Sequence, residues 1–387
     1  MDRLLRTSNK QRAVAALVVL VGLLAGVGCG MEFEPYWRVS GYRLLAIQAD
    51  PPAMKPGGVA TFRALDYRPD GVEVSYEWSW CPVEPSAQQR YDCPVDEVVA
   101  SQADAGMGAD GGADAGMGGG GGFGAFDPSI FELGTDETAV LPYPGSRDQV
   151  FELCQSIQQA VAEAEEESGL TGLLPTTDCE RGYEINIRLE ATPEGGEPIV
   201  ARKRVKLWTG GEANGNPRQT GLQIRPISQE VADRVRGTLD WVKPSGTPLS
   251  EQWHTMPVDE KTVLANGAKY QVRVQVDKSR IEEWRPPAPT GSQQERLPPE
   301  EEAIDFQWFV SGGELDPASR VYQKDFGNFE KARQTDWNIP IEEVEPCKEG
   351  AGACDVRLWT VLRDGRLGID WAERTVKIVE KSDGGGR

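Results

Sequence analysis

The chain has 387 residues, with 41 Lys or Arg against 61 Asp or Glu, and therefore carries a formal charge of −20. An acidic surface of this kind repels phosphate backbones, which excludes nucleic acid as an expected partner. The length is sufficient for two domains, each with its own hydrophobic core.

The N-terminal segment has the order of an export signal. Its basic residues come first, at Arg3, Arg6, Lys10 and Arg12. The apolar stretch 13–27 follows, and it is shorter than the roughly 20 residues of a membrane-spanning helix. The segment resembles the signal of bacterial lipoproteins, in which residues 1–28 are removed and Cys29 is lipidated. An uncleaved anchor or an ordinary signal peptide is the alternative, since Gly26 stands where such signals usually have Leu.

Lipoprotein processing would leave an even more acidic chain. It removes four basic residues and Asp2, which takes the formal charge from −20 to −23. The resemblance implies lipid anchoring in the cell envelope. Gly30, in place of the Asp that retains some lipoproteins at the inner membrane, favours the outer membrane, on its periplasmic or surface-exposed face. The expected partners are the membrane, through the lipid, and an unidentified envelope protein or surface glycan.

The other cysteines agree with export. An even number of cysteines in an oxidising compartment predicts disulfides. Cys347 and Cys354 are the last two in the chain and are predicted to pair. Four more allow three pairings, and short loops favour two of the bonds. These bonds are Cys81 to Cys93 and Cys154 to Cys179. The chain has no CxxC spacing and one histidine, which argues against a zinc site.

Alternation of apolar and polar residues predicts strands along the whole chain. In 72–80, for example, Tyr76 and Trp78 share one face while Glu77 and Ser79 share the other. Such strands suit antiparallel sheets that bury one face, packed against each other in pairs. The predicted strands are 43–49, 59–65, 72–80, 183–191, 199–208, 270–276, 304–310, 356–362 and 376–378.

A weak internal repeat suggests two copies of one architecture. Ala201–Leu207 aligns with Ala372–Ile378, and the Tyr76/Trp78 pair has its counterpart in Phe306 and Trp308. This order resembles immunoglobulin-like or PKD-like domains, in which a buried Trp lies on a central strand. It implies a mainly β fold of two immunoglobulin-like antiparallel β-sandwich domains, the first carrying an inserted helix and a disordered Gly-rich loop. The opening 44–58 and the Trp-Ser-Trp-Cys-Pro run also resemble surface lipoproteins of myxobacteria.

Composition places the boundaries. We expect a signal peptide (1–28), a tether (29–38), a first sandwich (39–209), a linker (210–219), a second sandwich (220–381) and a tail (382–387). The first sandwich contains a low-complexity insertion at 101–126, too poor in apolar residues to form a core.

One helix is predicted within the first sandwich, at 147–168. Ser146 and Gln149 form a capping box, and an apolar face follows. We interpret the helix as a crossover between strands, and a partner-binding helix is the alternative.

Motifs for catalysis are missing from the sequence. Gly119, Gly121 and Gly124 match GxGxxG, but no strand precedes them and no helix follows. The aspartate-containing repeats of the same insertion lack the aliphatic residue of calcium-binding glycine repeats, which argues against a calcium site. His254 stands beside Trp253, where an aromatic loop contact is more probable than a general base. We therefore expect no enzyme, no cofactor and no metal site.

Eleven tryptophans raise the question of carbohydrate binding. Trp78, Trp308 and Trp359 lie in predicted strands and are expected in the core. A second set lies in polar or Pro-rich segments, where an exposed ring could stack on a sugar. This set is Trp253, Trp284 and Trp337. The sequence thus predicts a non-catalytic, envelope-anchored structural or protein-interaction module, with a surface adhesin or carbohydrate-binding accessory as the alternative.

Overall fold

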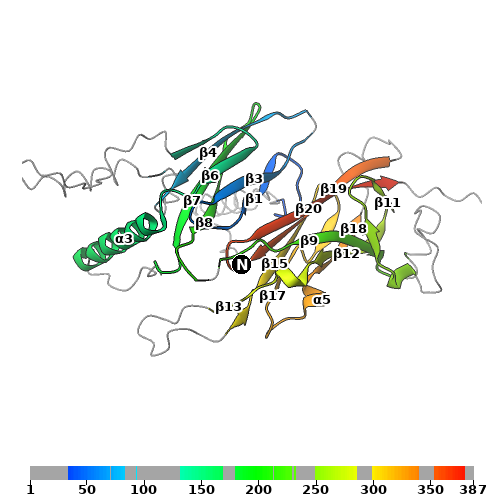
Figure 1. Cartoon of the computed structure of the whole chain (residues 1–387). Helices are drawn as coiled ribbons and strands as arrows, with labels where there is room; N and C mark the ends of the chain where they lie inside the picture. Colours follow the sequence, from blue (N-terminus) through cyan, green and yellow to red (C-terminus); the bar gives the residue numbers. More distant parts are fainter. Residues whose placement is uncertain are drawn as a thin grey trace, which may run out of the picture. The chain divides into compact units, whose positions relative to one another are not determined.

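The computed structural model describes residues 34–69, 71–82, 93, 131–168, 179–211, 213–228, 231, 249–285, 299–339 and 353–379, with side chains in the helix as far as 159. Trp37–Arg387 forms one compact unit, and Met1–Tyr36 forms another. The fold is mainly β, built from antiparallel sheets, as predicted (Figure 1). In the part of the chain that is described, no helix is long and apolar enough to cross a membrane.

The N-terminal lobe, defined as residues 39–209, packs two sheets face to face. The first sheet has the order β1 (Arg43–Asp50), β3 (Val59–Tyr67), β6 (Thr138–Pro142). The second has the order β2 (Ala53–Met54), β8 (Ile199–Leu207), β7 (Tyr183–Pro193), β4 (Val74–Cys81), β5 (Glu132–Gly134). Their inner faces bury Phe62, Trp78 and Ile185 completely.

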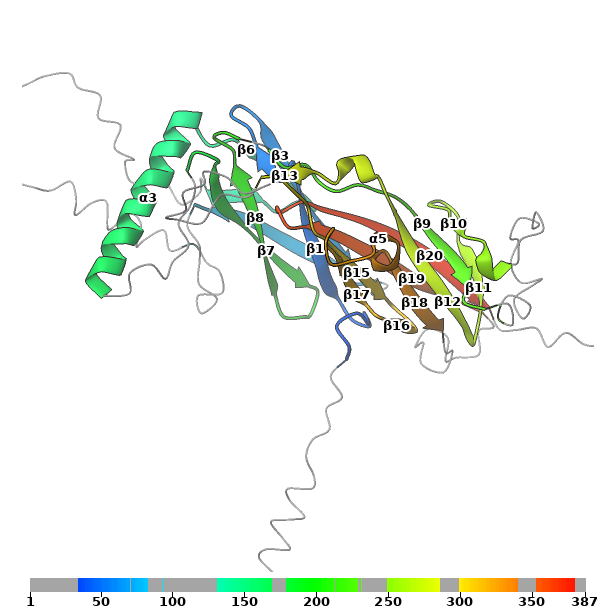
Figure 2. The same cartoon turned by 90° about the horizontal axis from the view of Figure 1, so that it is seen from below.

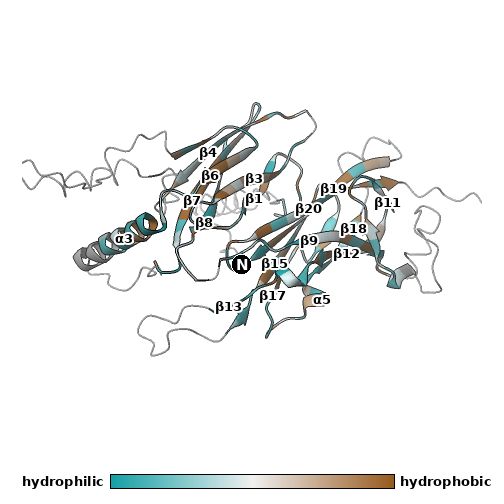
Figure 3. Cartoon of the chain, viewed as in Figure 1, coloured by the Kyte–Doolittle hydropathy of each residue, from teal (hydrophilic) through white to brown (hydrophobic). Residues whose placement is uncertain are grey.

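The C-terminal lobe, defined as residues 219–379, repeats this scheme with two five-stranded sheets. The outer sheet has the order β10 (His254–Met256), β9 (Gln219–Pro226), β12 (Ala268–Val276), β18 (Gln334–Ile339), β16 (Glu314–Asp316). The inner sheet has the order β11 (Thr262–Ala265), β20 (Ile369–Val379), β19 (Ala353–Asp364), β15 (Ile304–Val310), β17 (Ser319–Tyr322). Brown segments within these strands mark the apolar positions (Figure 3).

Short elements complete the C-terminal lobe. They are the hairpin β13 (Glu283–Trp284) and β14 (Glu300–Glu301), the 3-10 turns η3 (Leu249–Glu251) and η4 (Lys278–Arg280), and the helix α5 (Phe329–Ala332).

Two strand pairs depart from the antiparallel expectation. β2 pairs parallel with β8, and β11 pairs parallel with β20. β8 and β20 are the two strands that carry the internal repeat, and the residues Val205, Leu207, Val376 and Ile378 of that repeat are buried. Each repeat strand therefore has the same surroundings, with an antiparallel hairpin partner on one side and a short parallel strand on the other.

The predicted helix is α3 (Arg147–Ser168). Its capping box is formed, because Gln149 N donates to Ser146 Oγ at 3.2 Å and Ser146 N donates to Gln149 Oε1 at 2.7 Å. Val150 and Cys154 are buried against the N-terminal lobe. Cys154 is bonded to Cys179 just before β7, so the helix is fixed to the lobe at its first turns.

A third apolar core, which we call the junction core, joins the lobes. It consists of Val39, Leu45, Ala46, Leu65, Phe309, Trp359, Val361 and Ile369, with Tyr67 and Trp371 packed against it. The rings of Tyr67 and Trp359 meet edge to face at 5.3 Å. β1 lies beside β20 in both views of the chain (Figures 1 and 2). Where they meet the junction core, β15, β19 and β20 are thus buried on both faces, not on one as their alternation suggested.

Polar contacts close the junction. Gln48 of β1 donates to Ile369 O at 2.6 Å, and Asn216 donates to Ala49 O at 2.8 Å while accepting from Ile369 N at 2.9 Å. Asn214 is buried as well. The segment 210–219, expected as a linker, connects the lobes but is held against both of them. Whether each lobe folds alone stays a prediction.

The end of the predicted tether is also part of the fold. Val39 N donates to Val310 O, and Val310 N donates to Trp37 O, each at 2.9 Å. Arg38 forms a parallel bridge with Val310. The tether therefore ends near Tyr36. The expected signal peptide, the insertion 101–126 and the tail lie outside the described residues.

Candidate functional site

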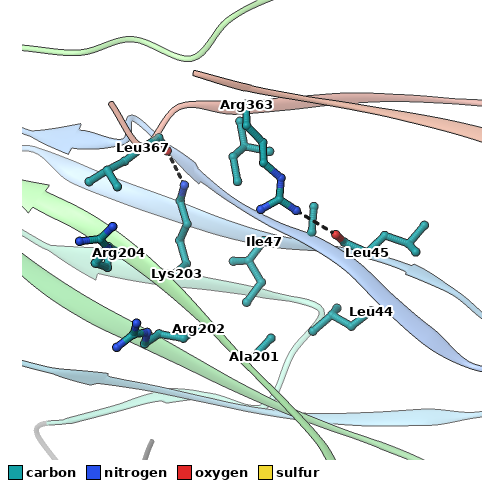
Figure 4. Close-up of a pocket in the computed structure, with 11 residues that line it drawn as sticks. Leu44, Leu45, Ile47, Ala201, Arg202, Lys203, Arg204, Arg363 and Leu367 are labelled. Carbon is teal, nitrogen blue, oxygen red and sulfur yellow. Dashed lines mark hydrogen bonds between the residues drawn. The ribbon is translucent and has the colours of Figure 1, made fainter. Parts of the chain in front are cut away.

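A described cavity opens where β1 and β8 meet the turn between β19 and β20 (Figure 4). We call it the junction pocket. Its volume is about 340 Å³, which falls within the range of small-molecule sites. It is lined by Leu44, Leu45, Ala46, Ile47, Ala201, Arg202, Lys203, Arg204, Arg363, Leu367 and Ile369. The lining thus contains four cationic residues and no acidic residue, in a chain with a formal charge of −20.

Lys203 reaches into the pocket from β8. It has the inward orientation of Val205 and Leu207, because residues two apart share a face of a strand. The side chain is only 6% exposed, and its ammonium donates to Leu367 O. Burial lowers the pKa of Lys203 to about 8, although the Asp364 carboxylate opposes this shift.

The turn that accepts this hydrogen bond is built rigidly. Asp364 Oδ1 accepts from Arg366 N at 2.8 Å and from Gly368 N at 2.7 Å, and both carboxylate oxygens accept from Asn214. A Cβ at Gly368 would come within 2.0 Å of the Asp364 carboxylate and 2.8 Å of Pro217 Cδ, so a larger residue there would displace the carboxylate. Leu367 has a φ of 80°, a conformation that costs a leucine about 1–2 kcal/mol. The carbonyl that faces Lys203 therefore belongs to a strained residue.

Arg363 approaches the pocket from β19. One of its terminal nitrogens donates to Leu45 O at 3.3 Å, while its buried Nε has no hydrogen-bond partner. Burial lowers the pKa of Arg363, and the Asp305 carboxylate opposes this shift. The head groups of Arg202 and Arg204 lie away from the Lys203 ammonium (Figure 4). Two cations, Lys203 and Arg363, therefore determine the charge inside the pocket.

A second cluster of ionisable side chains lies at the β13–β14 hairpin. Arg366 donates to Glu282 and to Glu302, each at 3.1 Å. Glu302 is 1% exposed, and burial together with the Asp364 carboxylate raises its pKa to about 7. The guanidinium of Arg366 also lies 5.3 Å from the ring of Trp284. This cluster fixes the hairpin to the lobe.

The predicted sugar-stacking tryptophans are not brought together. Trp337 is wholly buried in β18, where its indole donates to Gly312 O at 3.1 Å, so its assignment to an exposed segment was wrong. Trp253 is half-buried, with the guanidinium groups of Arg225 and Arg273 at 4.5 and 4.1 Å from its ring. Trp284 is half-buried beneath Arg366. Among the described residues no tryptophan is fully exposed.

The core assignments of Trp78, Trp308 and Trp359 are confirmed, since all three are fully buried. His254 is half-buried at the start of β10, and burial lowers its pKa. No group of three or more His, Cys, Asp or Glu side chains in the described ranges is placed to hold a metal ion.

The structure contains the two disulfides expected for the N-terminal lobe. Cys81 and Cys93 have Cα atoms 5.4 Å apart, and those of Cys154 and Cys179 are 5.7 Å apart. Cys354 is also disulfide-bonded. Its expected partner Cys347, and the lipidation residue Cys29, lie outside the described residues, so both assignments stay predictions.

The residues of the junction pocket were not singled out in the sequence, although part of the signal was there. Lys203 interrupts the apolar face of a strand that ends in Val205 and Leu207, which is an unusual place for a lysine. Arg363 gave no such signal. It lies on the face of β19 that packs against the N-terminal lobe, and the sequence does not show that this face is covered.

No protein-family model matches the sequence, and no curated protein matches it. Similar solved structures include a protocadherin gammaB7 EC3-6 cis-dimer, at 12% identity and a TM-score of 0.17, over 54% of this chain and 34% of that chain. The chain therefore spans about a third of the protocadherin chain. Three N-terminal domains of the outer capsid protein Hoc of bacteriophage RB49 match at 6% identity and a TM-score of 0.18, over 88% of this chain and 99% of that one. The C-terminal domain of the Streptococcus agalactiae AgI/II polypeptide BspA matches at 8% identity and a TM-score of 0.14, with the same two coverages. These scores are too low to support an argument about function.

Proposed function

We propose that the protein is a non-catalytic, lipid-anchored module of the cell envelope that holds or presents a binding surface. The observation that carries this proposal is the junction core, through which the two sandwiches pack together within one compact unit. A scaffold benefits from such rigidity, because a surface that is already ordered loses less entropy when it binds.

Lipid anchoring at Cys29 rests on the resemblance of residues 1–29 to lipoprotein signals. The disulfides Cys81–Cys93 and Cys154–Cys179 support export, since such bonds persist in oxidising compartments. The outer membrane is the proposed location. Its support is Gly30, the residue that follows the lipidated cysteine.

A carbohydrate-binding role is less favoured. Sugar stacking needs an open aromatic face. The ring of Trp253 already lies against the guanidinium groups of Arg225 and Arg273, and the ring of Trp284 lies against that of Arg366. The module proposal does not require any of these rings to be open.

The anchoring half of the proposal is tested by mass spectrometry and fractionation. The wild-type protein should begin at an acylated Cys29 and sediment with membranes, while Cys29→Ala should lose both properties. Gly30→Ala is the matched control and should behave as wild type. An unmodified Cys29, or residues 1–28 retained on the mature protein, contradicts lipidation.

The module half is tested by cross-linking in native membranes, followed by affinity purification. We expect one envelope component to be recovered with the wild-type protein and lost from Trp359→Ala, which disrupts the junction core. Recovery of the same component from a variant shown by proteolysis to have loosened lobes would contradict a role for the rigid body.

A further inference from the structure

The junction pocket contains a buried lysine and a half-buried arginine whose charges no acid neutralises directly. Within the described part of the chain, neither the Lys203 ammonium nor the Arg363 guanidinium has a carboxylate within ion-pair distance. The acid that most affects Lys203, Asp364, is occupied by hydrogen bonds from Asn214 and from the backbone of its own turn. The fold therefore keeps two positive charges at one cavity.

This arrangement is unfavourable for the protein alone. Taking a charged group out of water is costly unless an opposite charge and hydrogen bonds compensate. The only hydrogen-bond acceptors that the structure gives these two head groups are backbone carbonyls, those of Leu367 and Leu45. Arg363 Nε has no acceptor at all. An anion in the pocket would supply the missing compensation.

The rest of the lining indicates what kind of anion fits. Leu44, Ile47 and Ala201 are apolar, and Leu367 adds a further apolar side chain from the strained turn. In Figure 4, Lys203 extends toward Leu367 and Arg363 extends toward Leu45. The volume of about 340 Å³ suits a small molecule with a charged head and a short aliphatic part.

We propose that the junction pocket binds a small aliphatic carboxylate, with its carboxylate between Lys203 and Arg363 and its hydrocarbon against Leu44, Ile47 and Leu367. This site is independent of the proposed anchoring. Because its walls come from both lobes, the bound carboxylate also links β8 and β1 to the β19–β20 turn.

Calorimetric titration of the full-length chain in detergent tests the proposal, with butyrate as probe. 1-Butanol serves as the uncharged comparator of the same chain length, and titration into detergent alone supplies the blank. We expect saturable binding of one butyrate, roughly tenfold or more tighter than butanol, because charge-assisted hydrogen bonds form with butyrate alone. Lack of saturable butyrate binding, or equal affinity for butanol, would overturn the proposal.

Variants locate the site. Lys203→Met and Arg363→Met should each weaken butyrate binding roughly tenfold or more and leave butanol binding unchanged. Arg188→Gln is the matched control, because Arg188 lies on the neighbouring strand β7, outside the pocket lining, and pairs with Glu190 at 2.6 Å. Retained butyrate affinity in both methionine variants, or its loss in Arg188→Gln, argues against this pocket.

A second measurement uses the wild-type chain and needs no variant to fold. Amine-directed acylation of Lys203, followed by peptide mass spectrometry, should slow when butyrate is present. Lys261, an exposed lysine paired with Asp355, should react at an unchanged rate. Equal labelling of Lys203 with and without saturating butyrate would place any binding elsewhere.

Discussion

Arginines on the outer sheet of the C-terminal lobe have side-chain hydrogen-bond acceptors and an aromatic ring as partners, whereas the cations of the junction pocket do not. Arg225 donates to Gln271 at 2.8 Å and Arg273 to Gln223 at 2.6 Å, and both lie against the Trp253 ring. These cations are half-exposed and need little compensation. In the pocket, Lys203 is buried and Arg363 is half-buried, and both have only backbone acceptors. Positive charge on the outer sheet is thus structural, whereas in the pocket it is left available.

Breaking the junction itself should have the largest effect. Trp359→Ala removes a fully buried ring from the junction core and is expected to lower the free energy of unfolding by about 3–5 kcal/mol. Trp253→Ala on the outer sheet is the comparison and should lose clearly less, because that ring is half-buried. Urea unfolding measures both. Equal losses would show that the lobes are not stabilised through their junction.

Removing the pocket charge should stabilise the chain. The pKa of Lys203 falls from 10.5 to about 8 on folding, so the folded protein pays a penalty of about 3 kcal/mol below pH 8. Between pH 8 and about 10.5 the unfolded chain keeps this proton while the folded chain has lost it. The penalty therefore disappears across this interval, and stability should rise with pH. Lys203→Met should be more stable than wild type at pH 7 and lack this rise. A wild-type curve parallel to that of Lys203→Met would contradict a buried charged lysine.

The β13–β14 hairpin offers a pH dependence of opposite sign. Folding raises the pKa of Glu302 from 4.5 to about 7, so the folded chain binds the extra proton in that interval and stability should fall as the pH rises through it. Arg366 offsets part of the loss, and the effect should be smaller than that of Lys203. Glu302→Gln should flatten the curve between these values, as followed by thermal unfolding. An unchanged slope would mean that Glu302 ionises normally.

On the outer sheet, loss of a single cation should matter little. Arg273→Gln removes one cation–π contact and one hydrogen bond at a half-exposed position, and about 0.5–1 kcal/mol is expected. Urea unfolding beside Lys203→Met gives the comparison directly. A loss of unfolding free energy as large as that of Trp359→Ala would mean that the outer sheet contributes as much to stability as the junction core.

The smallest effect is expected from the glycine-rich insertion, which lies outside the described residues. Deleting 106–122 should leave the melting temperature nearly unchanged, because the entropic cost of loop closure depends only weakly on loop length. A drop of many degrees would show that the insertion packs on the lobe.

The sequence predicted most of the long strands, because period-two alternation is strong where one face is buried. It missed β9, which has eight residues. It also missed β18, where Thr335, Trp337 and Ile339 alternate with Asp336 and Asn338 over too few residues to stand out. The parallel pairs of β2 and β11 also escaped, since strands of two and four residues carry almost no pattern.

The junction core was harder to foresee. Along β19, Trp359, Thr360, Val361 and Leu362 are all buried, and such a run is typical of a strand covered on both faces. The sequence contains this signal, but nothing local says what covers the second face. The candidate site depends on that information, since the pocket exists only because β1 and β8 meet the turn at Leu367.

The pairing of residues 37–39 with Val310 has a mechanical consequence. If the chain is held at its N-terminal end, as proposed, tension first reaches two backbone hydrogen bonds at the end of β15. β15 belongs to the inner sheet of the C-terminal lobe, so the load enters this sheet before it reaches β1. Pulling on the anchor would then load these two hydrogen bonds first, and the full force would reach β1 of the N-terminal lobe only after they break.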